Sequence, residues 1–135
     1  MLILIAAALA TGATAGGPKG KKPALEIRPA PRFGFSPMHV LFTAELKGGD
    51  DVEDYYCPEL EWRWDDGGKS LKEADCPAFE AGVTKIERRF TNEHDFKDSG
   101  VYTIELTLRK ADRLIARQTV SVTVRPGLGD RVINP

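Results

Sequence analysis

The sequence predicts an all-β sandwich, an architecture in which two β-sheets pack face to face. Apolar and polar residues alternate with a period of two in the strong segments after residue 23. Glycine, proline and short polar runs separate these segments at regular intervals. No segment has the three- and four-residue apolar spacing of an amphipathic helix. We therefore expect about seven short strands and no long helix.

The first two strands are expected at residues 25–28 and 40–46. In both segments apolar side chains alternate with charged or hydroxyl side chains, as in a strand with one buried face. Between them, prolines at 29, 31 and 37 remove backbone donors and fix φ. The segment 29–38 is therefore predicted to be non-helical.

The next expected strand carries Leu60, Trp62 and Trp64 on one face. Core packing is the default role for both tryptophans. The Asp66-Gly67 pair that follows is a preferred two-residue hairpin turn, and pairing across it sets Trp64 opposite Lys69.

Three more strands complete the sandwich. A strand is expected from Ile86 to Phe90, although its alternation turns Arg88 toward the inside. Residues 102–108 and 116–124 alternate most clearly, and a short polar connection, residues 110–113, joins them. These last two segments are predicted to form a hairpin.

Residues 1–15 have the pattern of a secretory signal peptide. Nine apolar residues, Leu2 to Ala10, run into the small-x-small triplet Ala13-Thr14-Ala15, with cleavage expected after Ala15. The run is shorter than the roughly 20 residues that span a bilayer, so no membrane span is expected. No lysine or arginine precedes the run. The alternative is a buried apolar strand or helix. With export, the protein is secreted or periplasmic.

The remaining chain divides into a leader, one domain and a tail. Residues 16–23 combine glycine, proline and lysine and predict a flexible, solvated leader, whereas residues 126–135 predict a loose tail. The sandwich is expected between residues 24 and 125. Charged residues make up 29% of the chain, yet the net charge is −1. This balance argues against a nucleic-acid interface, which requires a basic face or stripe.

Three motifs resemble those of the polycystic kidney disease (PKD) domain family. Trp62-Arg63-Trp64-Asp65-Asp66-Gly67-Gly68 is similar to its aromatic-x-Trp-Asp-x-Gly turn. His94-Asp95-Phe96 resembles its His-Thr-Tyr element, and residues 100–108 resemble its Gly-x-Tyr-x-Val-x-Leu-x-Val strand. The resemblance covers residues 24–125. The chain departs from the family pattern at Gly68-Lys69 and in having a cysteine pair.

The resemblance implies an immunoglobulin-like β-sandwich of an extracellular, non-catalytic kind, used for interactions or for spacing other domains. It also implies a structural role for His94. Independently, Tyr102 lies where immunoglobulin-like sandwiches place a corner tyrosine, whose hydroxyl bonds to nearby backbone. In antibody-type domains a cysteine follows that tyrosine by two residues, whereas this chain has Ile104 there.

The two cysteines, Cys57 and Cys76, are predicted to form a disulfide. They lie almost symmetrically about the Asp66-Gly67 turn, so a hairpin folded there brings them close together. Export to an oxidising compartment favours their pairing. The alternatives are two buried free thiols or a zinc site, although two cysteines without nearby histidines fall short of four zinc ligands.

An acidic loop, residues 50–54, is a candidate calcium site. Its four carboxylates, with Asp65 and Asp66 as further candidates, are oxygen ligands of the kind that calcium takes. The spacing does not match an EF-hand, however, and a solvated loop is the simpler interpretation. Asp65 and Asp66 are also explained as turn residues that bond their own backbone. We expect no metal ion and no other cofactor.

No catalytic motif is present. Neither His39 nor His94 lies in a Gly-x-Ser-x-Gly or His-Glu-x-x-His pattern. A carboxylate pair for glycoside hydrolysis stays open from sequence alone. Tyr55 and Tyr56, beside the acidic loop, are the candidates for exposed contact, because interfaces favour tyrosine.

The sequence therefore favours a secreted, non-catalytic module that binds or spaces, with no catalytic or cofactor residues. Its partner is expected to be an extracellular or envelope protein or a glycan. The alternatives are an accessory subunit of an envelope or extracellular assembly, and a small secreted hydrolase or inhibitor.

Overall fold

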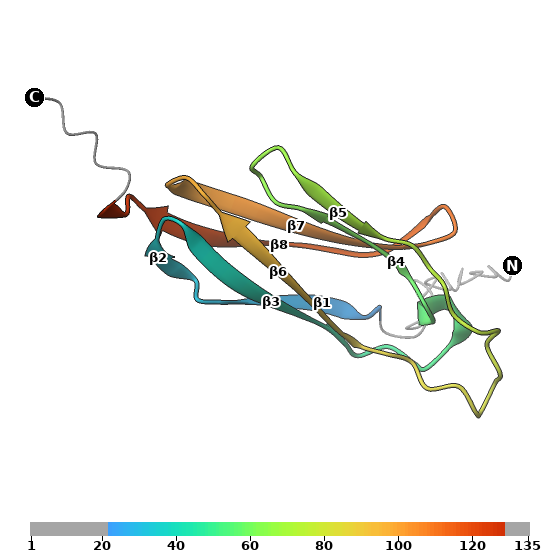
Figure 1. Cartoon of the computed structure of the whole chain (residues 1–135). Helices are drawn as coiled ribbons and strands as arrows, with labels where there is room; N and C mark the ends of the chain where they lie inside the picture. The colour runs from blue at the N-terminus through green and yellow to red at the C-terminus, as the bar shows by residue number, and fades with distance from the viewer. Residues whose placement is uncertain (1–21, 129–135) are drawn as a thin grey trace, which may run out of the picture.

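The computed structural model describes residues 22–128 (Figure 1). The predicted signal peptide, residues 1–15, lies outside the described residues, as do most of the leader and residues 129–135. In the described part of the chain no helix is long and apolar enough to cross a membrane.

The described residues form two packed β-sheets, which confirms the predicted sandwich. One sheet has three strands in the order β1-β3-β6, and the other has five in the order β2-β8-β7-β4-β5. A 3-10 turn, Glu53–Tyr55, precedes β4. The strands are β1 (Ala24–Ala30), β2 (Phe33–Phe35), β3 (Met38–Lys47), β4 (Glu59–Arg63), β5 (Lys69–Lys72), β6 (Arg89–Phe96), β7 (Gly100–Lys110) and β8 (Arg113–Arg125).

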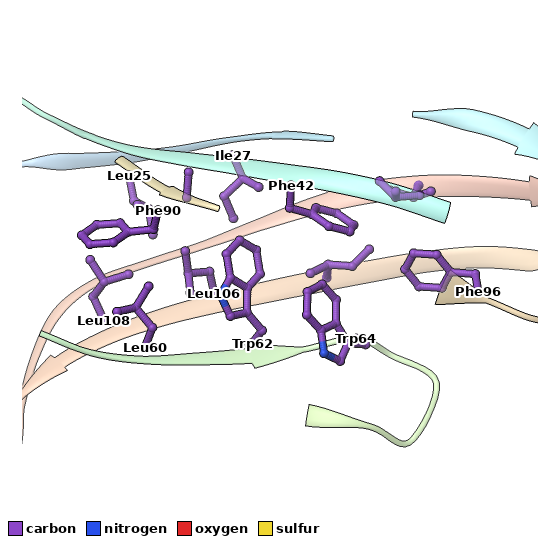
Figure 2. Packing of buried hydrophobic residues seen from close by; sticks show 14 of the residues in the cluster. Leu25, Ile27, Phe42, Leu60, Trp62, Trp64, Phe90, Phe96, Leu106 and Leu108 are labelled. Carbon is purple, nitrogen blue, oxygen red and sulfur yellow. The ribbon is translucent and has the colours of Figure 1, made fainter. Parts of the chain in front are cut away.

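The core lies between the two sheets, where the alternating apolar side chains meet. Figure 2 shows Trp62 on β4 and Trp64 just after it, both pointing toward Phe42 on β3. The rings of Phe42 and Trp64 lie 5.2 Å apart, and both tryptophans are buried. Their predicted core role is confirmed. Burying each large aromatic side chain stabilises the sandwich by about 2–3 kcal/mol.

The predicted C-terminal hairpin is confirmed as β7 and β8. The two strands pair along their length from Gly100↔Val124 to Lys110↔Arg113, with an irregularity at Leu108/Arg109. Among the described residues this is the longest strand pairing, and β7 is the central strand of the five-stranded sheet.

The turn between β4 and β5 differs from the predicted two-residue turn. Arg63 pairs with Lys69, and the Trp64 N–H donates to the Gly68 carbonyl. Trp64 therefore faces Gly68 and not Lys69. The loop is longer because Asp65 adopts a positive φ of 66°, a conformation that aspartate tolerates better than most residues.

The strand predicted from Ile86 to Phe90 begins later and runs further. β6 starts at Arg89 and continues to Phe96, antiparallel to β3. Residues 73–88, between β5 and β6, contain no strand. Because β6 pairs only with β3, one edge of the three-stranded sheet has no neighbour in the described part of the chain.

The start of the predicted loose tail is packed against β2. Gly127 is buried, and its N–H donates to the Ser36 Oγ at 3.0 Å. A Cβ atom at position 127 would lie 1.9 Å from the Ser36 carbonyl oxygen, so only glycine fits. The domain thus continues past residue 125.

Candidate functional site

The motif residues from three distant segments form one cluster at an end of the sandwich. The His94 imidazole on β6 stacks on the Trp64 indole, with ring centroids 4.3 Å apart and planes within 3°. Trp64 in turn stacks on Trp62. Phe96 packs edge-on against His94 and lies beside Tyr102. The cluster joins the two sheets through aromatic contacts, which add to the stability that burial supplies.

Two carboxylates of the β4–β5 turn hold this cluster in place. Asp66 Oδ1 accepts the Gly68 N–H at 2.9 Å, and its Oδ2 lies 2.6 Å from His94 Nε2. Asp65 Oδ2 accepts the Thr103 N–H of β7 at 2.9 Å. Asp65 thereby extends the β4–β7 pairing past the end of β4. The turn-forming role of Asp66 is confirmed, and Asp65 bonds a neighbouring strand.

The Asp66 carboxyl group has a pKa below its usual range. Burial alone would raise the pKa, because it disfavours the charged form. The hydrogen bonds from His94 and from the Gly68 N–H favour the carboxylate and outweigh burial. Asp66 is therefore held as an anion beside the imidazole.

Tyr102 is a corner tyrosine, as the sequence predicted. Its hydroxyl donates to the Asp98 carbonyl at 2.7 Å, four residues upstream. The hydrogen bond fixes the connection between β6 and β7.

The contacts of His94 in this cluster hold the fold together. The described contacts of His94 are with one carboxylate and the rings of Trp64 and Phe96. Activation of a nucleophile would require a hydroxyl or thiol within hydrogen-bond reach of the imidazole, and these contacts include none in residues 22–128. The Trp64 indole N–H donates to Ser70 Oγ at 2.9 Å, which places that hydroxyl on the tryptophan.

Cys57 and Cys76 form a disulfide, as predicted, with their Cα atoms 6.2 Å apart. The bridge ties the start of β4 to the segment after β5. Tyr56 supports the same connection, because its hydroxyl donates to the Pro77 carbonyl at 2.6 Å and its ring packs on Phe79.

The expected contact role of Tyr55 and Tyr56 is not supported by their positions. Tyr55 packs against the hydrophobic core, and both side chains are half-buried. Their burial depends on contacts with segments far away in the sequence, so the local pattern gave no sign of it.

Two carboxylates of the acidic loop form ion pairs with different cations. Asp51 pairs with Arg88 at 2.8 Å, and Asp54 pairs with Arg113 at 3.0 Å. Within residues 22–128 no group of three or more His, Cys, Asp or Glu side chains is placed to hold a metal ion. Asp51 and Asp54 thus serve as ion-pair partners in this structure.

Arg88 is a structural residue whose importance the sequence did not reveal. Arg88 is half-buried just before β6, and its guanidinium donates to the carbonyls of Leu46 and Gly48 at 3.2 and 2.6 Å as well as to Asp51. The side chain clamps the turn that follows β3.

His39 lies on the solvent side of β3. Its Nδ1 is 2.5 Å from Asp95 Oδ1 on β6, and its Nε2 is 3.7 Å from Glu93. The hydrogen bond with Asp95 raises the pKa of His39, because the carboxylate favours the imidazolium.

The structure has an exposed apolar patch that was not predicted from the sequence. Phe33 and Phe35 on β2 are 51% and 62% exposed, and Val101, in the same row as Phe33 across β8, is 68% exposed. The rings of Phe33 and Phe35 meet edge to face, 6.2 Å apart, and Arg125 lies over Phe33. The two phenylalanines face solvent because β2 pairs them with the outward residues Thr123 and Arg125 of β8.

A shallow hollow of about 180 Å³ lies between the edge strands β5 and β6. Its apolar lining is Leu60, Trp62, Leu71 and Phe90, and its polar lining includes Lys72, Arg89 and Asn92. Its volume is below the ~300 Å³ at which small-molecule sites begin.

No protein-family model matches this sequence, and no curated relative does. The fold does match a solved structure, the PKD domain of an M14-like peptidase from Thermoplasmatales archaeon SCGC AB-540-F20. The match has a TM-score of 0.55 and 14% sequence identity, and it covers 78% of this chain and 98% of that chain. The chain therefore has a PKD-like, immunoglobulin-like sandwich fold.

Proposed function

We propose that this chain is an exported, non-catalytic PKD-like module that acts by contact with a partner or by spacing. The observation that carries the proposal is that the side chains of the family-like motifs make structural hydrogen bonds within the fold. Asp65, Asp66, His94 and Tyr102 each hold the fold together. Chemistry would need at least one such group facing a substrate.

The exposed apolar patch supports a contact role. Large exposed aromatic side chains are enriched at interfaces. The Phe33 and Phe35 ring planes differ by 72°, so they do not form one flat platform for a sugar ring. This arrangement favours a protein partner over a glycan.

The disulfide supports export. Disulfides persist in secreted and periplasmic proteins and are rare where thiols are kept reduced. A bond between Cys57 and Cys76 agrees with the signal-peptide pattern of residues 1–15.

The test is a pull-down from the native envelope or medium with immobilised protein that begins at Gly16. The Phe33→Ser/Phe35→Ser variant removes the patch, and Leu71→Ser/Val83→Ser removes two other exposed apolar side chains as a matched control. We expect a specific protein to bind the wild type and the control but not the patch variant. The purified partner should reproduce this order of affinities.

Two outcomes would change the proposal. Retention of glycans without protein would make the chain a carbohydrate module. Turnover on a broad panel of hydrolase substrates would show that it is an enzyme.

A further inference from the structure

The open edge of β6 presents a regular row of backbone groups. The Leu46 N–H donates to the Arg88 carbonyl at 2.8 Å, which fixes the phase of pairing between β3 and β6. Antiparallel pairs alternate between bonded and non-bonded positions. The even-numbered residues of β6 therefore bond β3. Its odd-numbered residues, from Arg89 to Asp95, point their N–H and C=O groups away from the sheet.

One of these outward N–H groups already has a local acceptor. The Glu93 N–H donates to the Oδ1 of its neighbour, Asn92, at 2.8 Å. This bond agrees with the phase derived above, because a side chain can reach Glu93 N–H only at an open edge. Open edges of this kind are templates for pairing with another chain.

The charges on the outward face of β6 are self-complementary. Along the strand, Arg89 and Thr91 are followed by Glu93 and Asp95, so the positive end and the negative end lie at opposite termini. All four side chains are exposed. In an antiparallel pair of identical strands, opposite ends meet.

We propose that β6 pairs with β6 of a second copy of this chain, antiparallel and with Asn92 on the two-fold axis. Arg89 then lies opposite Asp95 of the second copy, and Thr91 lies opposite Glu93. The odd-numbered residues bond each other, so the outward N–H and C=O groups from 89 to 95 find partners. Two three-stranded sheets become one continuous six-stranded sheet with a closed, isologous interface.

The existing cross-strand neighbours favour the same register. Glu45 lies beside Arg89, and His39 lies beside Asp95. Across the proposed interface, Glu45 and Arg89 of one copy are followed by Asp95 and His39 of the other. Acidic and basic side chains therefore alternate along this row. Opposite charges placed directly across strands are stabilising, and like charges are destabilising.

Neighbouring registers are penalised by charge. A shift of two residues toward the C-terminus places Glu93 opposite its own copy and Arg89 opposite Lys97. The reverse shift keeps a favourable pair, Arg89 opposite Glu93, but it also places Glu87, just before β6, opposite Asp95. In the proposed register the Glu93 N–H donates to the second copy. The Asn92 carboxamide, which lines the hollow between β5 and β6, then no longer accepts that hydrogen bond.

The experiment is sedimentation equilibrium of the disulfide-bonded protein over a wide concentration range. We expect a monomer–dimer equilibrium for the wild type. In a homodimer of Arg89→Glu, the new glutamate of each copy faces Asp95 of the other, which makes two like-charged pairs. In a homodimer of Asp95→Arg, the new arginine of each copy faces Arg89 of the other. Each variant alone should dimerise about 10- to 100-fold more weakly.

A mixture of the two variants gives the sharpest result. In the heterodimer, Glu at position 89 faces Arg at position 95, and the native Asp95 of one copy faces the native Arg89 of the other. The mixture should therefore recover dimers that neither variant forms alone. Arg109→Glu, an exposed reversal on β7, should leave the wild-type equilibrium unchanged. Melting temperatures of the isolated variants check that each is folded.

Three results would overturn the proposal. These are a wild type that stays monomeric at its highest soluble concentration, single variants that dimerise like the wild type, and a mixture that stays monomeric. A monomeric wild type would leave the β6 edge to a strand from another protein.

Discussion

Asp66 shows how one side chain can serve two contacts at once. One carboxylate oxygen closes the β4–β5 turn on Gly68, and the other orients the His94 imidazole against Trp64. The turn and β6 are therefore linked through a single residue. Because the carboxylate form is favoured in the folded state, the link depends on pH.

The folded-state pKa of Asp66 lies below its unfolded value, so its contribution is present above about pH 4 and is lost as pH falls through the folded pKa. We expect the wild type to lose more stability than Asp66→Asn between neutral and acidic pH. Thermal unfolding from pH 7 to pH 3 measures this difference. Parallel pH curves for the two proteins would contradict it.

At the scale of elements, the strands were predictable where one face is buried along the whole segment. In β7 and β8 apolar residues alternate over most of the segment, with Gln118 as the polar exception in β8, and both strands were found. In β6 the inward side chains include the polar Asn92 and His94, which hide the alternation. Each of these polar side chains has a hydrogen-bond partner. Asn92 accepts the Glu93 N–H, and His94 bonds Asp66, which comes from a distant turn.

The candidate site was predictable in part for similar reasons. The corner role of Tyr102 follows from local spacing, and its partner is four residues away. The pairing across the β4–β5 turn could not be predicted from the sequence. The Thr103 N–H of β7 bonds the Asp65 side chain and not a backbone carbonyl at that position. Exposure of Phe33 and Phe35 depends on which face of β8 they adjoin, which the sequence of β2 does not contain.

The turn after β3 depends on Arg88. Its guanidinium donates to Leu46, Gly48 and Asp51, and hydrogen bonds to a charged group contribute about 1.5–3 kcal/mol. We expect Arg88→Ala to lower the free energy of unfolding by about 2 kcal/mol. Arg88→Lys should recover only part of the loss, because lysine lacks the planar fork. Urea denaturation measures both, and an unchanged midpoint for Arg88→Ala would refute the clamp.

The disulfide constrains the hairpin that carries both tryptophans. Its cysteines are 19 residues apart, a separation for which the chain-entropy model gives about 3 kcal/mol. The Cys57→Ser/Cys76→Ser variant should lose about 2–4 kcal/mol of stability. Reduced wild type should match the variant in denaturant titrations. Equal stability of oxidised and reduced protein would show that the bridge contributes nothing.

For the whole molecule, the ion pairs of the acidic loop connect it to both sheets. Asp51 reaches Arg88 before β6, and Asp54 reaches Arg113 at the start of β8. Exposed pairs of this kind contribute little individually, with a median of about 0–1 kcal/mol. A calcium ion in the loop would have to compete with Arg88 and Arg113 for these two carboxylates.

We accordingly expect calcium to leave the melting temperature unchanged. A ligand that binds only the folded state would raise it by mass action. Asp51→Asn/Asp54→Asn is the control, since it removes the two loop carboxylates that form ion pairs. A saturable rise in the wild type that the double variant lacks would establish a calcium site in residues 50–54.

We propose that this disulfide-linked sandwich module is exported. The most direct test is the intact mass, under non-reducing conditions, of protein recovered from the periplasm or medium. The predicted mass is that of a chain beginning at Gly16 and lacking the two hydrogen atoms lost when Cys57 and Cys76 join. A cytoplasmic protein that keeps Met1 and two alkylatable thiols would contradict the claim.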